Sequence, residues 1–371
     1  MSKFLVVSGD FVKTGGMDMA NFALAMHLAQ RGDSVHLVTH RADAELTALP
    51  NVHVSLVTKP LNSYLLGSPV LDWQGRRAAQ RFAGEVIVNG GNCVCAGVNW
   101  VHYVHSAWKP VAQGRVLKTW CTHHAAVHQE REALRKARVV IANSDRTRHD
   151  LIERMSVEPE RTHTVYCGID AKTFRPASVE AKREQRRQLG WGQEPVVAFI
   201  GGLADRRKGF DRLFAAWKLL CDGSGWDATL AVIGAGPELE YWKSLAAEQG
   251  MSDRVRFLGF RRDVPAVLGA CDALVAPVRY EPYGLAVQEA ICLGLPALVT
   301  RTAGVAERYP AELQELLLDD SDDAGLLASR IENWRNEPDS YSASIAALAA
   351  KLRENTWDAM ASRIAALAEA Q

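Results

Sequence analysis

The sequence lacks several features that would assign it to a specialised class of protein. Its 43 lysines and arginines balance 43 aspartates and glutamates, so net charge gives no support to a nucleic-acid partner. No apolar run reaches the roughly eighteen residues of a membrane-spanning helix. The opening residues, MSKFLVVSG, are too short an apolar stretch for a secretory signal. We therefore expect a cytoplasmic protein, with a peripheral position at the inner face of a membrane left open.

Sequence patterns typical of a bound metal or a dinucleotide cofactor are also missing. Cys93 and Cys95 are separated by one residue and have no second pair, so they do not match a zinc site. His124 and His128 lack both the HExxH pattern and a third ligand. The first glycine-containing loop is not GxGxxG, which argues against a nicotinamide or flavin. The sequence therefore predicts neither a metal nor a cofactor.

The most informative segment is 279–296, which reads RYEPYGLAVQEAICLGLP. Apolar runs at 273–277 and 296–300 flank it, so the pattern predicts strand, glycine-containing turn, helix and strand, a βαβ unit. In parallel sheets, ligands bind at the carboxyl ends of strands, toward which the next helix directs its N-terminus. Phosphate oxygens would find main-chain N–H groups there at Tyr283, Gly284 and Leu285.

Two glutamates belong to this helix and its approach. Glu281 precedes the helix, and Glu289 lies about one and a half turns into it. A carboxylate inside the helix suits vicinal hydroxyls, as the ribose-binding acid does in dinucleotide folds. Two acids at an arbitrary spacing are more often a solvated helix surface. Here the surrounding Pro-Tyr-Gly-Leu and Leu-Gly-Leu-Pro favour a phosphate flanked by hydroxyl-binding carboxylates, which describes a nucleotide sugar.

The stretch EPYGLAVQEAICLGLP resembles the signature of retaining glycosyltransferases of family 4. The resemblance implies an α/β protein with the GT-B fold, in which two Rossmann-like domains face a central cleft and the C-terminal domain holds most of the donor. It implies that Glu281 contacts the donor sugar and diphosphate and that Glu289 binds the ribose. It also implies a reaction that requires no metal.

The resemblance extends to the cations expected to hold the diphosphate, in the segment LADRRKG at 203–209. The family has an arginine soon after the preceding strand and a lysine before the later glycine. Lys208 matches the lysine, but Gly202 stands where the arginine is expected, and Arg207 is the substitute. A similar Arg-Lys-Gly triplet occurs in lipopolysaccharide-core glucosyltransferases of the family. Two cations can neutralise a diphosphate without a divalent metal.

In the first half, the resemblance points to a glycine and a histidine. A Gly-Gly pair closes over the donor phosphates in the family, which gives that role to Gly16. The segment 98–108, VNWVHYVHSAW, is expected to be a strand with His105 at its carboxyl end. A family histidine at that end lies near the anomeric carbon of the donor, so His105 matches, with His102 as the alternative. A histidine buried in the core is the ordinary alternative for either residue.

The expected domains are an acceptor-binding domain at 1–176, a nucleotide-sugar-binding domain at 177–352, and a helix at 353–371 that crosses back to the first domain. The boundary follows CGIDAKTF, which resembles the segment where the family leaves its N-terminal domain. The stretch 59–81 looks irregular and carries aromatic residues beside arginines. It could contact lipid head groups or line an acceptor groove, and a surface loop and helix is the ordinary alternative.

We therefore expect a retaining transfer of a hexose from a nucleoside diphosphate sugar, with a UDP-sugar as the first choice, to a hydroxyl of a glycan or glycolipid. Bacterial surface polysaccharide or lipopolysaccharide is the expected product class. The residues expected to act in catalysis are Glu281, His105 and Lys208. One alternative is a sugar-nucleotide epimerase of the same architecture, whose product stays nucleotide-linked. Another is a non-catalytic partner that binds the donor without turnover.

Overall fold

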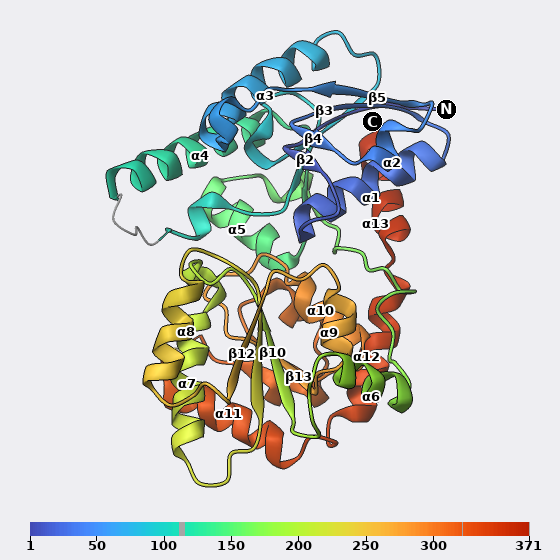
Figure 1. Ribbon diagram of the computed structural model, residues 1–371. Coiled ribbons are helices and arrows are strands. Elements are labelled where there is room, and N and C mark those ends of the chain that lie inside the picture. The colour runs from blue at the N-terminus through green and yellow to red at the C-terminus, as the bar shows by residue number, and fades with distance from the viewer. Residues whose placement is uncertain (111–115, 321, 371) are drawn as a thin grey trace. The chain divides into compact units, whose positions relative to one another are not determined.

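A computed structural model describes residues 1–110, 116–320 and 322–370 (Figure 1). The chain forms two compact units: unit 1 comprises Met1–Gly168 and Asn355–Gln371, and unit 2 comprises Ile169–Glu354. The sequence placed these boundaries after residue 176 and at residue 353. Ile169 is buried in the core of unit 2 and the unit extends to Glu354, so it begins earlier and ends slightly later than expected.

Unit 1 is built on a seven-stranded sheet with the order β5-β3-β1-β6-β7-β8-β9. All its strand pairs are parallel. Strands of this kind are covered on both faces and are therefore almost continuously apolar, as in the FLVV of the first strand. The strands are β1 (Lys3–Val7), β3 (Ser34–Thr39), β5 (Val52–Leu56), β6 (Glu85–Asn89), β7 (Val98–Val101), β8 (Val139–Ala142) and β9 (Thr162–Thr164).

Helices connect and cover these strands, and a separate two-stranded sheet, β2 (Asp10–Phe11) with β4 (Arg41–Ala42), lies in the loops. The helices are α1 (Gly16–Gln30), α2 (Ala44–Thr47), α3 (Tyr64–Ala79), α4 (Val116–Lys136), α5 (Asp145–Met155) and α13 (Trp357–Glu369). The last helix belongs to this unit because Met360 and Ile364 are buried in the same core as Leu24 and Leu28 of α1.

Unit 2 has a six-stranded parallel sheet with the order β12-β11-β10-β13-β14-β15. Its strands are β10 (Val196–Ile200), β11 (Thr229–Ile233), β12 (Val255–Gly259), β13 (Ala273–Ala276), β14 (Ala297–Thr300) and β15 (Leu317–Leu318). Its helices are α6 (Val179–Gln188), α7 (Phe210–Asp222), α8 (Leu239–Glu248), α9 (Val264–Gly269), α10 (Leu285–Cys292), α11 (Ala324–Asn336) and α12 (Ser342–Glu354). None of the helices in the described ranges is long and apolar enough to cross a membrane.

In each sheet, the direction in which the chain adds successive strands reverses once. In unit 2 the chain adds β11 and β12 on one side of β10 and then returns to add β13 on the other side. In unit 1 the corresponding reversal lies between β1 and β6. The loops after the two strands at a reversal diverge, which leaves a crevice where ligands of doubly wound sheets bind. A ligand of unit 2 is therefore expected to bind at the loops after β10 and β13.

One expectation about an element was wrong. The strand predicted over 98–108 ends at Val101, because its pairing with β8 ends where Val101 meets Ala142, the last residue of β8. His105 instead begins a short 3₁₀ helix, η3 (His105–Ala107). The stretch at 59–81 contains α3, a helix of 16 residues that includes Pro69, which agrees with the surface loop and helix given as the ordinary alternative.

Candidate functional site

The loops after β10 and β13 bring the predicted cations and the first glutamate together. A short 3₁₀ helix after β10, η5 (Arg206–Lys208), places Lys208 Nζ 2.5 Å from Glu281 Oε2. Arg207 Nη1 lies 3.5 Å from the same oxygen and donates a hydrogen bond of 3.1 Å to the carbonyl of Tyr280. The main-chain N–H of Arg279 donates back to the carbonyl of Arg207 over 2.8 Å. These links fix η5 against the loop that carries Glu281.

Gly209, directly after η5, permits this approach. Its φ of 74° lies in the left-handed region, where a side chain is unfavourable. A Cβ atom at this position would lie 1.9 Å from the carbonyl oxygen of Pro277, the residue that follows β13. The glycine of the Arg-Lys-Gly triplet is therefore required by the main-chain contact between the two loops.

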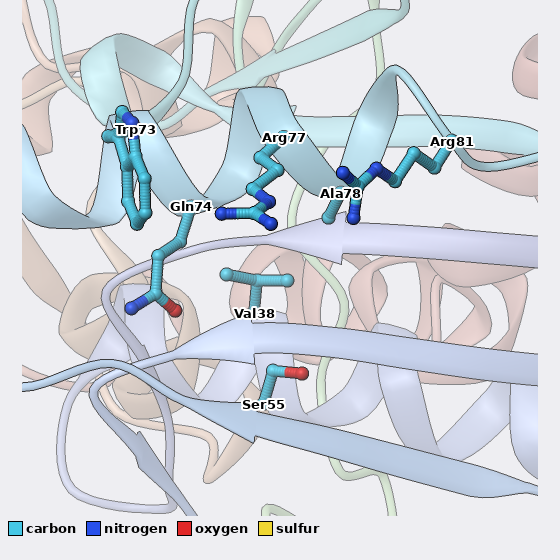
Figure 2. A pocket seen from close by; sticks show the side chains of 7 residues that line it. All are labelled: Val38, Ser55, Trp73, Gln74, Arg77, Ala78 and Arg81. Atoms are coloured by element: carbon cyan, nitrogen blue, oxygen red, sulfur yellow. The ribbon is translucent and has the colours of Figure 1, made fainter.

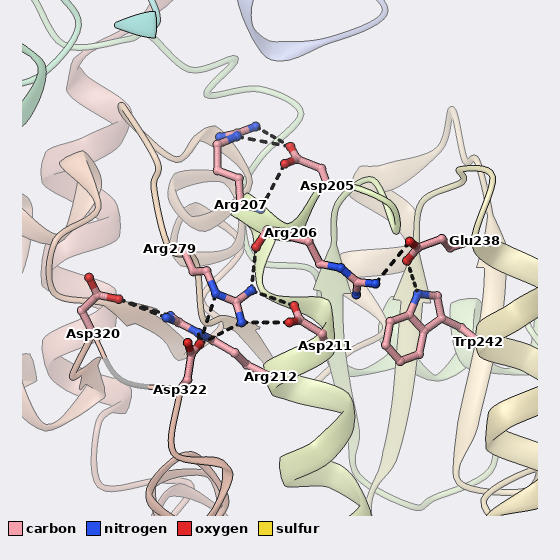
Figure 3. Close-up of polar contacts among 10 residues, drawn as sticks. All are labelled: Asp205, Arg206, Arg207, Asp211, Arg212, Glu238, Trp242, Arg279, Asp320 and Asp322. Carbon is pink, nitrogen blue, oxygen red and sulfur yellow. Dashed lines mark hydrogen bonds and ion pairs between the residues drawn. The ribbon is translucent and has the colours of Figure 1, made fainter. Parts of the chain in front are cut away.

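Arg279 supports the site from below, through a network that the sequence did not reveal (Figure 3). Its guanidinium donates two hydrogen bonds of 2.8 Å to Asp211 of α7, and a further one of 2.7 Å to the carbonyl of Arg206. It also pairs with Asp322 at 2.8 Å, and Asp322 in turn accepts from Arg212. The bidentate pair with Asp211 ties the start of α7 to the loop after β13.

Of the three consecutive cations of η5, the first has a different acidic partner from the other two. Arg206 pairs with Glu238 at 3.2 Å and lies over the ring of Trp242, so its side chain contacts the segment that follows β11. Arg207 and Lys208 approach Glu281. Burial by itself would raise the pKa of Glu281, but the charges of Lys208 and Arg207 outweigh it and lower that pKa. The carboxylate is therefore ionised at neutral pH and holds the two cations beside the loop after β13.

The N-terminus of α10 lies on the same loop. Gly284 precedes the helix with a φ of 114°, and a Cβ there would lie 2.9 Å from Val305 Cγ1. Within the described residues, the main-chain N–H groups of Gly284 and Leu285 donate to no acceptor, which is the usual state of a first helical turn. Tyr283 is buried and its hydroxyl donates to Gln288; the role predicted for this residue concerns its main-chain N–H group. The site thus combines two cations with a helix N-terminus that binds anions.

Glu289, the second predicted glutamate, stands apart from the charge cluster. No hydrogen bond or ion pair of its carboxyl group is found in the described ranges, and its side chain is only partly exposed. Burial raises the pKa of Glu289 to about 8. A carboxyl group held in such surroundings without a protein partner fits the hydroxyl-binding role that the sequence suggests.

In unit 1 the predicted residues follow strands near the reversal of the sheet. Gly16 is the exposed first residue of α1, the helix that follows β1 and the short strand β2. His102 directly follows β7 and is buried, and burial lowers the pKa of His102 to about 3. The side chain of His105 is 38% exposed. His105 is therefore the accessible histidine of the two, while contact of either one with a donor sugar stays a prediction.

The sequence did not indicate that a glutamate of α4 contacts His105. Glu130 is fully buried, and its Oε2 accepts a hydrogen bond of 2.9 Å from the main-chain N–H of His105. Its other oxygen lies 3.3 Å from His105 Nδ1. No local pattern could have shown this contact, because the two residues are 25 positions apart in the sequence.

A cavity of about 270 Å³ lies elsewhere in unit 1, between α3 and the strands β3 and β5. Figure 2 shows side chains of α3 directed toward the strands that carry Val38 and Ser55. Its lining includes Trp73, Arg77 and Arg81, and none of the predicted donor-binding residues. Across the described ranges, no group of three or more histidine, cysteine, aspartate or glutamate side chains could hold a metal ion.

Comparison with known proteins identifies the family. Residues 14–173 match the model described as Glycosyltransferase Family 4, and residues 181–356 match the one described as Glycosyl transferases group 1. A D-inositol 3-phosphate glycosyltransferase of Salinispora arenicola is 27% identical over 345 residues, which cover 84% of this chain and 77% of that protein.

Two solved structures show the same fold. WaaG, a glycosyltransferase involved in lipopolysaccharide biosynthesis, has a TM-score of 0.79 at 18% identity, with all of both chains covered (100%). Anabaena Alr3699/HepE in complex with UDP-glucose has a TM-score of 0.73 at 22% identity, with 99% of each chain covered. The chain therefore belongs to the glycosyltransferases of family 4 and has the GT-B fold, as its sequence motifs predicted.

Proposed function

We propose that this glycosyltransferase transfers a hexose from a UDP-sugar to a hydroxyl group, with retention of the anomeric configuration and without a metal. One observation carries the proposal: Arg207, Lys208 and the N-terminus of α10 converge where the sheet of unit 2 reverses. Such an arrangement neutralises a diphosphate through charge-assisted hydrogen bonds and free main-chain N–H groups. Glu281 and Glu289 flank it and can accept hydrogen bonds from sugar hydroxyls.

In the proposed reaction, the bond between the anomeric carbon and the diphosphate oxygen breaks while the acceptor oxygen bonds to the same face of that carbon. The electron pair of the broken bond remains on the diphosphate, and the proton of the acceptor hydroxyl passes to a diphosphate oxygen. Lys208 and Arg207 stabilise the negative charge that develops on the leaving group. Glu281 orients the sugar and is not a covalent nucleophile, because its carboxylate is already held by the two cations.

The relatives guide the choice of substrates. The structurally similar Anabaena protein was solved with UDP-glucose, which makes UDP-glucose the first donor to test. WaaG is described as involved in lipopolysaccharide biosynthesis, which makes a lipopolysaccharide core or another surface glycan the first acceptor class. Unit 1 would bind this acceptor, and Gly16 and His105 would approach the donor from it.

We also propose that the enzyme acts in the cytoplasm and contacts the inner face of a membrane through α3. The helix exposes Tyr64, Leu65, Leu66 and Trp73. It also carries Arg77, and neither Arg77 nor the following Arg81 has an acidic partner among the residues that the structure describes. Exposed aromatic and leucine side chains beside free arginines suit a surface of anionic lipid, where a glycolipid acceptor would be found.

The proposal is tested first by the thermal stability of the purified protein in a panel of nucleoside diphosphates and their sugars. A ligand that binds only the folded state stabilises it by about 2.7 kcal/mol at a hundred times its Kd. We expect UDP and UDP-hexoses to raise the Tm, and Glu289→Ala and Lys208→Ala to weaken this effect. Glu281→Ala should mainly lower turnover. Glu312→Ala, which removes an exposed carboxylate elsewhere in unit 2, is the matched control.

Turnover assays then separate the alternatives. Transfer of radiolabelled hexose to an acceptor supports the proposed reaction, and the anomeric configuration of the product tests retention. A product that remains nucleotide-linked when no acceptor is present would indicate an epimerase. Donor binding without turnover over a broad acceptor panel would indicate a non-catalytic partner. Parental donor binding and activity in the Glu281, Glu289 and Lys208 variants would refute the assigned site.

A further inference from the structure

Glu130 of α4 has a fully buried carboxylate, and each of its two oxygens lies against His105. Its Oε2 accepts from the main-chain N–H of His105 at 2.9 Å, and its Oε1 lies 3.3 Å from His105 Nδ1. Glu130 Oε1 and His105 Nδ1 are both buried, and neither has another polar partner in the described part of the chain. A buried carboxylate is costly unless it is paired, so its placement against one histidine requires an explanation.

Two glycines in a neighbouring turn leave space for Glu130. After β6, the 3₁₀ turn η2 (Gly90–Asn92) packs against α4. A Cβ on Gly91 would lie 3.2 Å from the main-chain nitrogen of Glu130, and a Cβ on Gly90 would lie 3.9 Å from Glu130 Oε1. Gly90 also has a φ of 51°, in the left-handed region. The two glycines therefore let α4 approach the edge of the sheet closely enough to bring Glu130 to His105.

The two contacts act on different parts of His105. The main-chain hydrogen bond fixes the first residue of η3, where the chain turns away from β7. The carboxylate beside Nδ1 favours a proton on that nitrogen and so leaves Nε2 as the acceptor in the neutral ring. Because Nδ1 is buried while the side chain is 38% exposed, the exposed part of the ring lies away from Glu130.

We propose that Glu130 is a positioning residue for His105: it fixes the orientation and tautomer of the imidazole so that Nε2 accepts a hydrogen bond from a hydroxyl of the donor sugar. The inference rests on the proposed function, because it assumes that His105 meets the donor. Glu130 itself touches no substrate. Its effect passes entirely through His105, which distinguishes it from a carboxylate that merely stabilises the fold.

A double-mutant cycle on the full-length protein tests this dependence. Glu130→Gln keeps the shape of the side chain but removes its charge. We expect it to lower kcat/KM for UDP-hexose by about ten- to a hundredfold, the usual effect of losing a hydrogen bond to a charged group. In the His105→Ala background the same substitution should change kcat/KM less than about twofold, because the residue it positions is gone. The Kd for the donor, measured by calorimetry, closes the cycle if turnover is too slow.

Two further variants make the outcome decisive. Glu132→Gln changes a partly exposed glutamate of the same helix, paired with Arg135, and should leave kcat/KM unchanged. If Glu130→Gln does not fold, Glu130→Asp replaces it in the cycle, because it keeps the charge but withdraws it from Nδ1. An equal loss in both backgrounds, or no loss in either, would overturn the inference while leaving the proposed function intact. Absence of donor binding in the parent protein would instead refute the proposed function.

Discussion

Glu289 makes the stability of unit 2 depend on pH in a direction opposite to that of most acids. Burial raises its pKa from 4.5 to about 8, so the folded protein holds a proton there that the unfolded chain has lost. The stabilisation is therefore fully present below pH 4.5 and is lost as the pH rises through about 8. Such a group contributes at most about 1.4 kcal/mol per pH unit within this interval.

We predict that Glu289→Gln reduces the fall in Tm of the ligand-free protein between pH 5 and about pH 8. A neutral amide cannot gain the charge that disfavours the fold, so the variant should be more stable than the parent at the upper end. Calorimetry at a series of pH values measures the effect, with Glu312→Gln as an exposed control. Parallel pH profiles for Glu289→Gln and the parent would show that Glu289 ionises freely in the folded state.

Single residues differed in how far the sequence could reveal them. Lys208 and Glu281 stood out because each lies in a short motif, and the structure brings them together. Arg279 and Glu130 did not, because their partners are distant in sequence: Asp211 lies 68 positions away from Arg279, and His105 lies 25 positions away from Glu130. Residues that support a site through contacts between elements leave no local signal, so only the fold reveals them.

Among the elements, the turn from η5 to α7 is the one on which the site depends most. Gly209 combines a positive φ with a carbonyl oxygen 1.9 Å from the position of a Cβ atom. We predict that Gly209→Ala costs at least about 3 kcal/mol, because the left-handed conformation alone costs about 1–2 kcal/mol and the clash requires β13 or η5 to move. Chemical denaturation of the full-length protein measures the loss of stability, and the Kd for UDP measures the effect on donor binding.

Gly190 provides a control for the conformational part of this cost. Its φ is 66°, and no atom lies within 4 Å of a Cβ built there. Gly190→Ala should therefore lose only about 1–2 kcal/mol and should bind UDP like the parent. If the two variants were equally stable, the contact between Gly209 and Pro277 would have no energetic importance.

The proposed membrane contact is a property of α3 as an element. Trp73 is 54% exposed, and the guanidinium of Arg77 lies 5.7 Å from the centre of its ring. We predict that Trp73→Ala with Arg77→Ala lowers binding to vesicles containing phosphatidylglycerol by about tenfold or more, since each arginine near an anionic surface contributes about 1 kcal/mol and the indole adds to it. Cosedimentation measures the binding.

A basic residue on the other unit serves as the control for this prediction. Arg183 of α6 is exposed and forms no ion pair in the described ranges, so Arg183→Ala removes the same charge from a different surface. It should bind vesicles like the parent. Equal losses for both variants would mean that general charge attracts the protein, and no binding by the parent would refute the membrane contact.

The elements themselves followed from the sequence where apolar runs alternated with periodic helices. Both sheets were expected to be parallel and crossed by helices, and they are. The end of β7 was missed because apolar and aromatic residues continue past Val101, whereas the strand stops where its partner β8 ends. Pairing length is set by the neighbouring strand and is invisible in a single segment.

At the scale of the whole molecule, the chain crosses between units twice, and its last residues return to the unit where it began. The motif at 167–174 located the first crossing only approximately. Hydrophobicity could not refine it, because Ile169 is apolar and suits either core. The second crossing lies between α12 and α13, two alanine-rich helices of similar pattern. Their apolar patterns do not show which core each helix covers; it was the family resemblance that predicted a return of the last helix to the first unit, where α13 lies.

This division predicts that two substitutions only twelve positions apart destabilise different units. Leu352 is fully buried in the core of unit 2, and Ile364 is fully buried in the core of unit 1. Truncating either residue to alanine should cost about 2–5 kcal/mol, because each leaves a cavity. Hydrogen exchange followed by mass spectrometry should show loss of protection in β10 and β13 for Leu352→Ala, and in β1 and β3 for Ile364→Ala. Loss of protection in both sheets from one substitution would mean that the units unfold together, and α13 would then stabilise the whole chain.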